Sequence, residues 1–240
     1  MSIAAALLLV AACAAPAPTR SPEPPASAAP EAGLELGQTF WTFYDPDLER
    51  VVLVNGAKES GPSKPTELWT WDGTSWELLD GAGPEARVFA AVGRDPERGV
   101  VIVQGGMSSL GDVFDETLEW DGETWTAPTS GAEGPGWREG AGFSWDPATQ
   151  RMLLFSGGAS GEHPPDTWTW SGTAWEQVAD TGPRPRFVSL MTEDRSGDGG
   201  VLLQGAHWVD GNDGGLLADT WHWDGEAWTE VAQGTGPGPR

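Results

Sequence analysis

The fold is decided by the stretch Trp69-Thr70-Trp71-Asp72-Gly73-Thr74-Ser75-Trp76, which returns three more times along the chain. The copies are Leu118-Glu119-Trp120-Asp121-Gly122-Glu123-Thr124-Trp125, Trp168-Thr169-Trp170-Ser171-Gly172-Thr173-Ala174-Trp175 and Trp221-His222-Trp223-Asp224-Gly225-Glu226-Ala227-Trp228. Successive copies are about fifty residues apart, a period typical of one supersecondary unit that stacks on copies of itself. The sequence therefore predicts a repeat architecture.

Other signals keep the same phase and outline the unit. Short apolar runs predict buried strands, and they are Val51–Val54, Val100–Val103, Met152–Phe155 and Val201–Leu203. Three of them follow a turn in which Pro presets φ and Asp bonds its own backbone, and these turns are Asp45-Pro46, Asp95-Pro96 and Asp146-Pro147. Each unit closes with a Gly-Pro-x-x-Arg segment, and these segments run from Gly83 to Arg87, Gly134 to Arg138, Gly182 to Arg186 and Gly236 to Arg240. We expect four antiparallel strands per unit.

The repeated Trp segment predicts the hairpin between the last two strands. With Asp-Gly at the centre of a type I′ turn, residue 71 would face residue 74, and Trp69 would stack on Trp76 across the strands. The same register would pair Trp168 with Trp175, Trp221 with Trp228 and Leu118 with Trp125. Such regularity favours a packing role for these rings over a sugar-binding platform.

Composition agrees with an all-β protein and excludes one class of partner. The chain has 240 residues with 34 Gly, 20 Pro and 15 Trp, which favours short strands joined by turns. The 36 acidic and 13 basic residues give a net charge of −23. A surface this acidic repels phosphate backbones, so we expect no nucleic-acid partner.

The repeat resembles the kelch family, because a pair of small residues follows the second strand and Trp residues lie in the third and fourth strands. The four pairs are Gly56-Ala57, Gly105-Gly106, Gly157-Gly158 and Gly205-Ala206. The resemblance covers residues 36 to 240 and is closest to bacterial exported kelch proteins similar to the central domain of galactose oxidase. It implies a β-propeller of four-stranded antiparallel blades, with units at about 36–87, 88–138, 139–186 and 187–240. The four variable strand 2–3 loops are the expected binding elements, and they are Lys58–Thr66, Met107–Asp115, Ala159–Pro165 and His207–Ala218.

No catalytic or cofactor site is predicted. The copper site of galactose oxidase needs a crosslinked Cys and Tyr, a second Tyr and two His, whereas this chain has one Tyr, Tyr44, and one Cys. The Asp box, nucleophilic Tyr and three-Arg clamp of sialidases also lack counterparts. We expect the arginines of the Gly-Pro-x-x-Arg segments to pair with acids of neighbouring blades.

Three His residues do not form a metal-ligating cluster either. His163, His207 and His222 lack the spacing of metal ligands, and His222 is expected to point to solvent because it stands between two Trp residues, at the position of Thr70, Glu119 and Thr169. The stretch Asp210-Gly211-Asn212-Asp213 offers oxygen ligands for calcium, but its spacing is not that of an EF-hand. We therefore predict no metal site and no cofactor.

The N-terminus reads as an export signal. Ile3–Val10 is apolar but too short to span a bilayer, as in the central region of a signal peptide. The following Val10-Ala11-Ala12-Cys13 resembles a bacterial lipobox, which implies cleavage after residue 12, lipid attachment at Cys13 and a location in the bacterial cell envelope. The alternative is an ordinary secretory signal cut among the alanines. Residues 13–35, rich in Pro and Ala, are expected to form an extended tether.

The functional expectation is a surface-anchored, non-catalytic propeller that binds a protein or a glycan through its variable loops. The alternative is a polysaccharide-active or other extracellular enzyme with its site in the central channel or in further blades. Contact with the membrane would be through the lipid at Cys13 alone. Because Gly236 to Arg240 matches the segment that elsewhere opens a new unit, we also expect the chain to be part of a longer propeller.

Overall fold

The computed structural model is all-β and describes residues 34–37, 39–57, 64–129, 133–158, 163–196, 199–210 and 213–233. Its strands form four sheets of four strands each, and within every sheet the strands pair antiparallel in chain order. The first two sheets consist of β1 (Phe40–Asp45), β2 (Arg50–Asn55), β3 (Glu67–Trp71), β4 (Trp76–Asp80), β5 (Ala91–Asp95), β6 (Val100–Gln104), β7 (Thr117–Trp120) and β8 (Trp125–Thr129). The other two consist of β9 (Gly142–Asp146), β10 (Arg151–Phe155), β11 (Thr167–Trp170), β12 (Trp175–Ala179), β13 (Leu190–Glu193), β14 (Val201–Asp210), β15 (Asp213–Trp223) and β16 (Trp228–Gln233).

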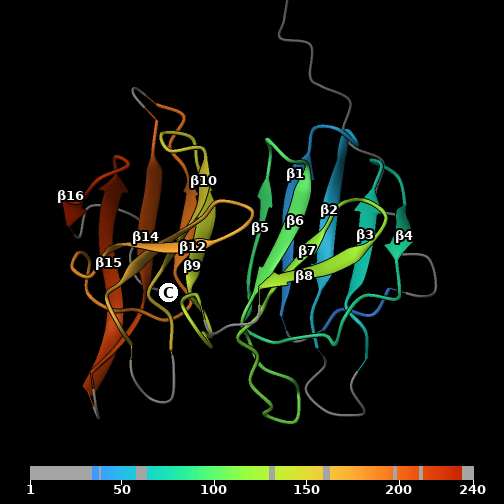
Figure 1. The fold of residues 1–240 in the computed structure, drawn as a ribbon, viewed down its shortest axis with the longest axis horizontal. Helices are drawn as coiled ribbons and strands as arrows, with labels where there is room; N and C mark the ends of the chain where they lie inside the picture. The colour runs from blue at the N-terminus through green and yellow to red at the C-terminus, as the bar shows by residue number, and fades with distance from the viewer. Residues whose placement is uncertain are drawn as a thin grey trace, which may run out of the picture.

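The four sheets are the blades of a four-bladed β-propeller, which confirms the predicted fold class. Figure 1 shows blades 1 and 2 on one side of the molecule and blades 3 and 4 on the other. The first strand of each blade is innermost, since β5 packs beside β1 and β9, and β9 packs beside β13. The ring is open between blades 4 and 1, because none of the described strands β1–β4 adjoins any of the described strands β13–β16.

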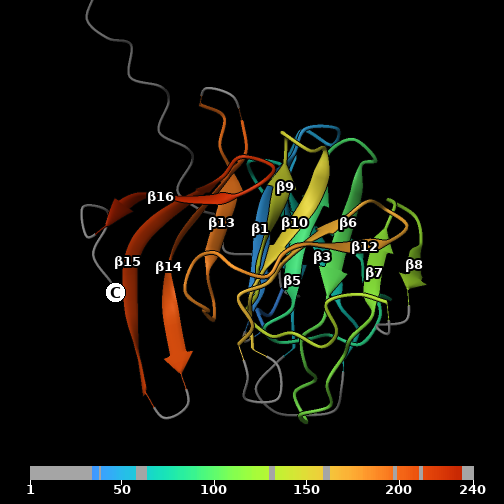
Figure 2. The same cartoon turned by 60° about the vertical axis from the view of Figure 1, so that its left-hand side comes forward.

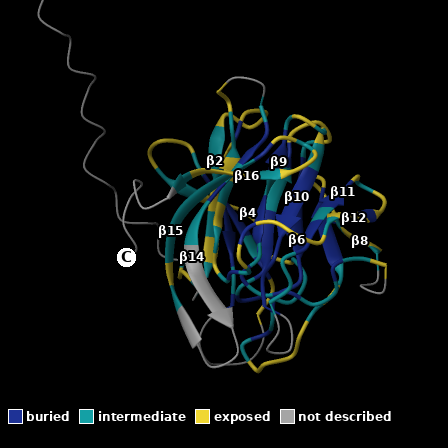
Figure 3. Ribbon diagram, turned by 90° about the vertical axis from the view of Figure 1, so that its left-hand side faces the viewer, coloured by how far each residue is buried: buried dark blue, intermediate teal, exposed yellow. Residues whose placement is uncertain are grey.

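The core lies in layers between successive blades. Each blade has a leading face, which packs on the preceding blade, and a trailing face, which packs on the next. One apolar cluster joins Ile102 of blade 2 to Met152 and Trp170 of blade 3, and a second joins Leu68 of blade 1 to Trp120 of blade 2. Blades 2 and 3 are covered on both faces, and their second strands, β6 and β10, are accordingly buried along almost their whole length (Figure 3).

The Trp-rich hairpins supply much of this packing. Every Trp side chain that the structure describes is buried or half-buried, which confirms the predicted packing role. The register differs from the expected one, because Trp71 lies opposite Trp76 and Trp69 opposite Leu78. The rings of Trp71 and Trp76 are 5.5 Å apart, and the equivalent pairs of blades 3 and 4 are both 5.4 Å apart.

A different turn explains the shifted register. Among the two central residues only Gly73 has a positive φ, of 100°, so the turn has the pattern of type II′ with Gly first. Asp72 stands before the turn, where its carboxylate accepts hydrogen bonds from the N–H groups of Thr74 and Ser75. The bonds from Ser75 and Thr74 lower the pKa of Asp72 from 3.8 to about 2. The prediction of a type I′ turn, with Trp69 against Trp76, was therefore wrong.

The fourth-strand Trp of blades 3 and 4 fits a socket built by the preceding blade. Trp175 donates a hydrogen bond to Thr117 Oγ1 over 2.8 Å, and a Cβ on Gly134 would lie 2.8 Å from its ring. Trp228 repeats this arrangement with Thr167 and Gly182. The glycine of the Gly-Pro-x-x-Arg segment is thus required because the Trp of the next blade packs against its backbone.

Backbone hydrogen bonds also connect the blades around the channel. Phe89, Gly140 and Val188 occupy the same repeat position and all have positive φ, of 57°, 63° and 57°. Gly140 N–H donates to the Phe89 carbonyl, and Val188 N–H donates to the Gly140 carbonyl, both over 2.7 Å. Positive φ is rare in bulky residues such as Phe and Val, so this inter-blade chain imposes the conformation.

The strand 2–3 connection of blade 4 differs from the expectation. The sequence suggests a loop over His207–Ala218, but most of that range belongs to the paired strands β14 and β15, with His207 opposite Leu216 and Asp210 opposite Asp213. This hairpin extends beyond the shorter strands of the other blades (Figure 2). The apolar run Val201–Leu203 ends before Gln204, and the rest of β14 is more polar, so the sequence pattern does not predict a strand there.

Candidate functional site

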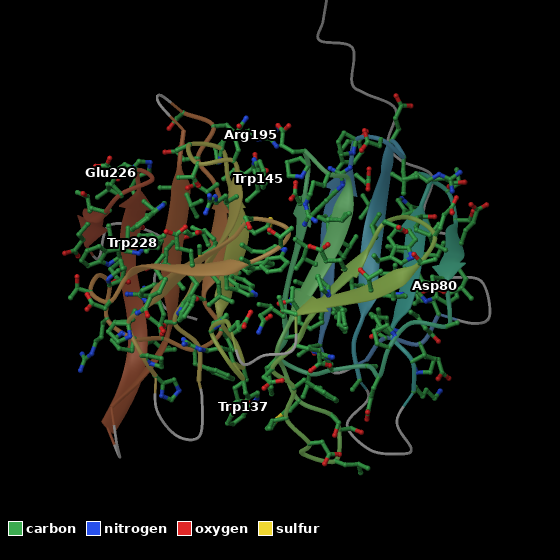
Figure 4. The ribbon with its side chains drawn as sticks, in the orientation of Figure 1. Asp80, Trp137, Trp145, Arg195, Glu226 and Trp228 are labelled. Carbon is green, nitrogen blue, oxygen red and sulfur yellow. The ribbon has the colours of Figure 1, made fainter. Side chains whose placement is uncertain are left out.

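The strand 2–3 connections and the strand 4–1 links lie on one side of the propeller, which we call the loop face. In Figure 4 Trp137 marks this end of the molecule, and Trp145 and Arg195 mark the opposite end. The loop face is held by buried arginines of the Gly-Pro-x-x-Arg segments. Arg138 binds both carboxylate oxygens of Asp166 at 2.6 Å and the Ser156 carbonyl at 3.0 Å.

The same clamp recurs in the other blades. Arg186 binds both carboxylate oxygens of Asp219 at 2.9 Å, and Arg87 binds Glu116. Burial raises the pKa of Asp219, but the hydrogen bonds from Arg186 and Trp221 outweigh it and leave that pKa lowered. Each Arg comes from the link that ends one unit and its acid from the next unit, as predicted. Arg240 lies outside the described residues.

The loop Met107–Asp115 is the one predicted binding loop that the structure describes throughout. Ser108, which is 2% exposed, organises it. Its amide donates to the Asp112 carbonyl over 2.7 Å, and its hydroxyl accepts from the amides of Leu110 and Asp112. Gly111, with a φ of 92°, makes the tight turn at the tip. The loop therefore has a fixed conformation built from its own hydrogen bonds.

Arg87 fixes this loop to the blade at its base. Its guanidinium donates to the Gly105 carbonyl before the loop, binds Glu116 after it, and lies 4.2 Å from the centre of the Phe114 ring. Burial lowers the pKa of Arg87, and the Glu116 carboxylate opposes that shift. Two apolar side chains nevertheless face solvent from this rigid support: Leu110 is 71% and Val113 is 50% exposed.

The other predicted loops are described only in part. Lys58–Thr66 is described from residue 64 onward, and Ala159–Pro165 from His163 onward, where His163 and Pro164 are half-buried. In the calcium candidate, Gly211 and Asn212 lie outside the described residues. Within the described part of the chain, no group of three or more His, Cys, Asp or Glu side chains is placed to hold a metal ion.

His222 is not directed freely to solvent, contrary to the sequence-based expectation. Its side chain is 24% exposed and lies 3.5 Å from the Asp194 carboxylate, with Nε2 3.0 Å from the Gly199 carbonyl. The equivalent residues Thr70, Glu119 and Thr169 are buried. This position packs beneath the strand 1–2 turn of its own blade, which the alternation of the Trp segment did not reveal.

The central channel forms a cavity of about 710 Å³ lined by the four inner strands. Its wall includes Tyr44, Arg94, Trp145 and Arg195, and the lone carboxylate among the described lining residues is Glu193. Arg195 binds Glu193 at 2.9 Å. Glycoside hydrolysis uses a pair of carboxylates across the scissile bond, and this lining does not present such a pair. Tyr44 occupies the repeat position of Arg94 and Trp145, as expected.

Comparison with known proteins identifies the fold and no family. No protein-family model matches the chain, and no curated protein matches it by sequence. The chain shares its fold with YjhT. A solved structure of YjhT matches with a TM-score of 0.60 and 14% identity, over 80% of this chain and 68% of that one. Among the described residues no helix is long and apolar enough to cross a membrane, and Cys13 lies outside them.

Proposed function

We propose that this chain is a kelch-type propeller that binds a protein partner through its loop face, with Leu110 and Val113 as central contacts. The observation that carries the proposal is a rigid loop that exposes two apolar side chains. Hydrogen bonds to Ser108 and the Arg87 clamp order the loop before any partner arrives, so binding costs little conformational entropy. Apolar residues on ordered loops favour a protein surface over a glycan.

The charge of the chain narrows the chemistry of the partner. With a net charge of −23, the protein attracts basic surfaces over long range and accelerates their association. Asp112 stands between the two exposed apolar residues, Asp115 follows them, and both Asp residues are exposed. We therefore expect a partner with an apolar pocket that is bordered by Lys and Arg, and binding that weakens with added salt.

Photo-crosslinking tests this assignment. A photoreactive amino acid in place of Leu110, in the protein produced in its own cells, is expected to yield a discrete protein adduct on irradiation. The same amino acid in place of Val178, which is 38% exposed on β12 of blade 3, is the matched control and should yield none. Adding Val113→Ser should reduce the Leu110 adduct at least about fivefold, because loss of a central contact costs more than about 1 kcal/mol.

Three results would contradict a protein-binding loop face. The first is crosslinking of equal yield from positions 110 and 178. The second is glycan-array binding that is insensitive to Leu110→Ser and Val113→Ser. The third is hydrolysis of chromogenic glycosides by the purified protein, which would favour the enzymatic alternative with its site in the channel.

We also propose export to the bacterial cell envelope with a lipid at Cys13, supported by the apolar Ile3–Val10 and the lipobox-like Val10-Ala11-Ala12-Cys13. A lipid at this residue would leave the loop face free to meet a partner outside the cell. Metabolic labelling with a fatty-acid analogue should mark the wild-type protein and leave Cys13→Ala unlabelled. Label retained by Cys13→Ala would instead favour an ordinary secretory signal.

A further inference from the structure

Two blade faces in this propeller have no described neighbour. The leading face of blade 1 carries Tyr44 and also Thr42, Trp71 and Trp76, and the last three hold repeat positions that pack on the preceding blade in blades 2 to 4. The trailing face of blade 4 carries Leu190, Leu202 and Thr220, at positions that pack on the next blade in blades 1 to 3. Leu190 is 73% and Tyr44 is 60% exposed. Trp71 and Trp76 are half-buried, whereas their equivalents Trp170 and Trp175 are 0% and 8% exposed.

Side-chain sizes at facing positions of the first strands indicate that these two free faces are complementary in shape. Along the inner strands, a large side chain in one blade faces a smaller one in the next, or the reverse. Trp41 of blade 1 packs against the apolar cluster that contains Val92 of blade 2, and Ala91 of blade 2 shares a cluster with Phe143 of blade 3. Gly142 of blade 3 lies against Met191 of blade 4. The next combination in this series is Leu190 of blade 4 with Thr42 of blade 1, and again one is large and the other small.

The hydrogen bonds of the Trp sockets give an independent match. The indoles of Trp125, Trp175 and Trp228 each donate to an acceptor on the preceding blade. The indole of Trp76, which belongs to blade 1 and has no preceding blade, donates to no described residue. Thr220 holds on blade 4 the register position that Thr167 holds on blade 3, and its hydroxyl has no hydrogen bond to a described residue. The free donor on blade 1 thus corresponds to a free acceptor on blade 4.

We propose that blade 4 of one copy of this chain docks on blade 1 of a second copy, and that two copies close into a ring of eight blades. The two faces are too far apart to meet within one chain, since the described strands of blades 1 and 4 do not adjoin. A two-fold axis along the channel creates both junctions at once, and each repeats the packing found between blades 1 and 2, 2 and 3, and 3 and 4. Repeated head-to-tail interfaces close into rings, and eight blades lie within the range of about four to eight typical of propellers.

Light scattering on the purified protein tests this assembly, with Cys13→Ser in place to leave out any lipid. The protein is expected to have the mass of two chains. Thr42→Glu and Leu190→Glu should each have the mass of one chain, because each buries a charge at both junctions. Both residues are exposed in the single chain, so neither substitution should disturb folding. Leu110→Glu, at a side chain equally exposed but on the loop face, is the matched control and should keep the mass of two chains.

An equimolar mixture of Thr42→Glu and Leu190→Glu provides the decisive measurement. In the mixture, Leu190 of the first variant can dock on Thr42 of the second, so association is expected to return through one intact junction. A wild-type protein with the mass of one chain, or a mixture that does not associate, would overturn the proposal and favour the other expected occupant of both faces, further blades of the same chain. A mass that grows steadily with concentration would overturn the closed ring in favour of an open array. The Leu110→Glu control separates these outcomes from any failure of the proposed function, which the assembly does not require.

Discussion

Replacing Arg138 by Met is expected to lower the free energy of unfolding by about 3–5 kcal/mol, because it leaves a buried carboxylate without its partner. The Arg138 side chain is 5% exposed, and its two nitrogens bind the two oxygens of Asp166. The same side chain ties the link that enters β9 to the Ser156 carbonyl at the end of β10. For a domain of this size, the loss corresponds to a fall in melting temperature of roughly 6–20 °C, measurable by calorimetry or circular dichroism.

Arg151→Met is the matched control. Arg151 forms a single 3.0 Å contact with Glu176, and the two side chains are 39% and 66% exposed. Solvent screens such a pair, so its loss should cost less than about 1 kcal/mol. Equal destabilisation by the two substitutions would show that the buried clamp contributes no more than a surface ion pair.

Replacing Trp170 by Ala is the second substitution with a large expected effect, again about 3–5 kcal/mol. The ring is 0% exposed and packs on blade 2, where its indole donates a 2.7 Å hydrogen bond to Glu119. The substitution both opens a cavity between blades 2 and 3 and removes a donor from a buried carboxylate. Chemical denaturation monitored by far-ultraviolet circular dichroism would measure the loss.

Trp71→Ala changes the same repeat position in the blade that has no described predecessor. Both Trp71 and Trp170 contact the fourth-strand Trp of their own blade at nearly the same distance, 5.5 and 5.4 Å. The smaller loss expected for Trp71→Ala therefore isolates the contribution of the preceding blade. Both variants are best compared with Leu190→Glu in place, so that no junction between copies contributes. Equal losses would mean that this Trp stabilises its own blade alone.

Much of the architecture could be predicted from the sequence, because four separate signals kept one phase over four units. The strand order and the packing role of the Trp residues follow from that periodicity. The sequence predicted that Arg138 pairs with an acidic residue of a neighbouring blade, since an Arg recurs once per unit in an acidic chain. The identity of its partner required the structure, because the acid varies between Glu116, Asp166 and Asp219. The first two stand just before the third strand of their blades, whereas Asp219 lies within β15.

Features that depend on backbone geometry were harder to predict. Asp-Gly favours a type I′ turn in short hairpins, but here the Asp72 carboxylate accepts two backbone N–H groups and places Gly73 first in the turn. His222 alternates with two Trp residues as a solvent-facing residue would, yet the strand 1–2 turn of blade 4 covers it. The rigid support of Leu110 was also hidden, because Ser108 organises the loop through bonds that have no sequence signature.

The dependence of each Trp socket on the blade before it has a consequence for how the chain is made. Gly134 and Thr117 are synthesised before Trp175, and Gly182 and Thr167 before Trp228. As the ribosome delivers each new hairpin, the surface that receives its indole is thus already present in the nascent chain. Since domains fold as units from the N-terminus during translation and repeats contact only their neighbours, this protein is suited to grow blade by blade, with every finished blade acting as the template for its successor.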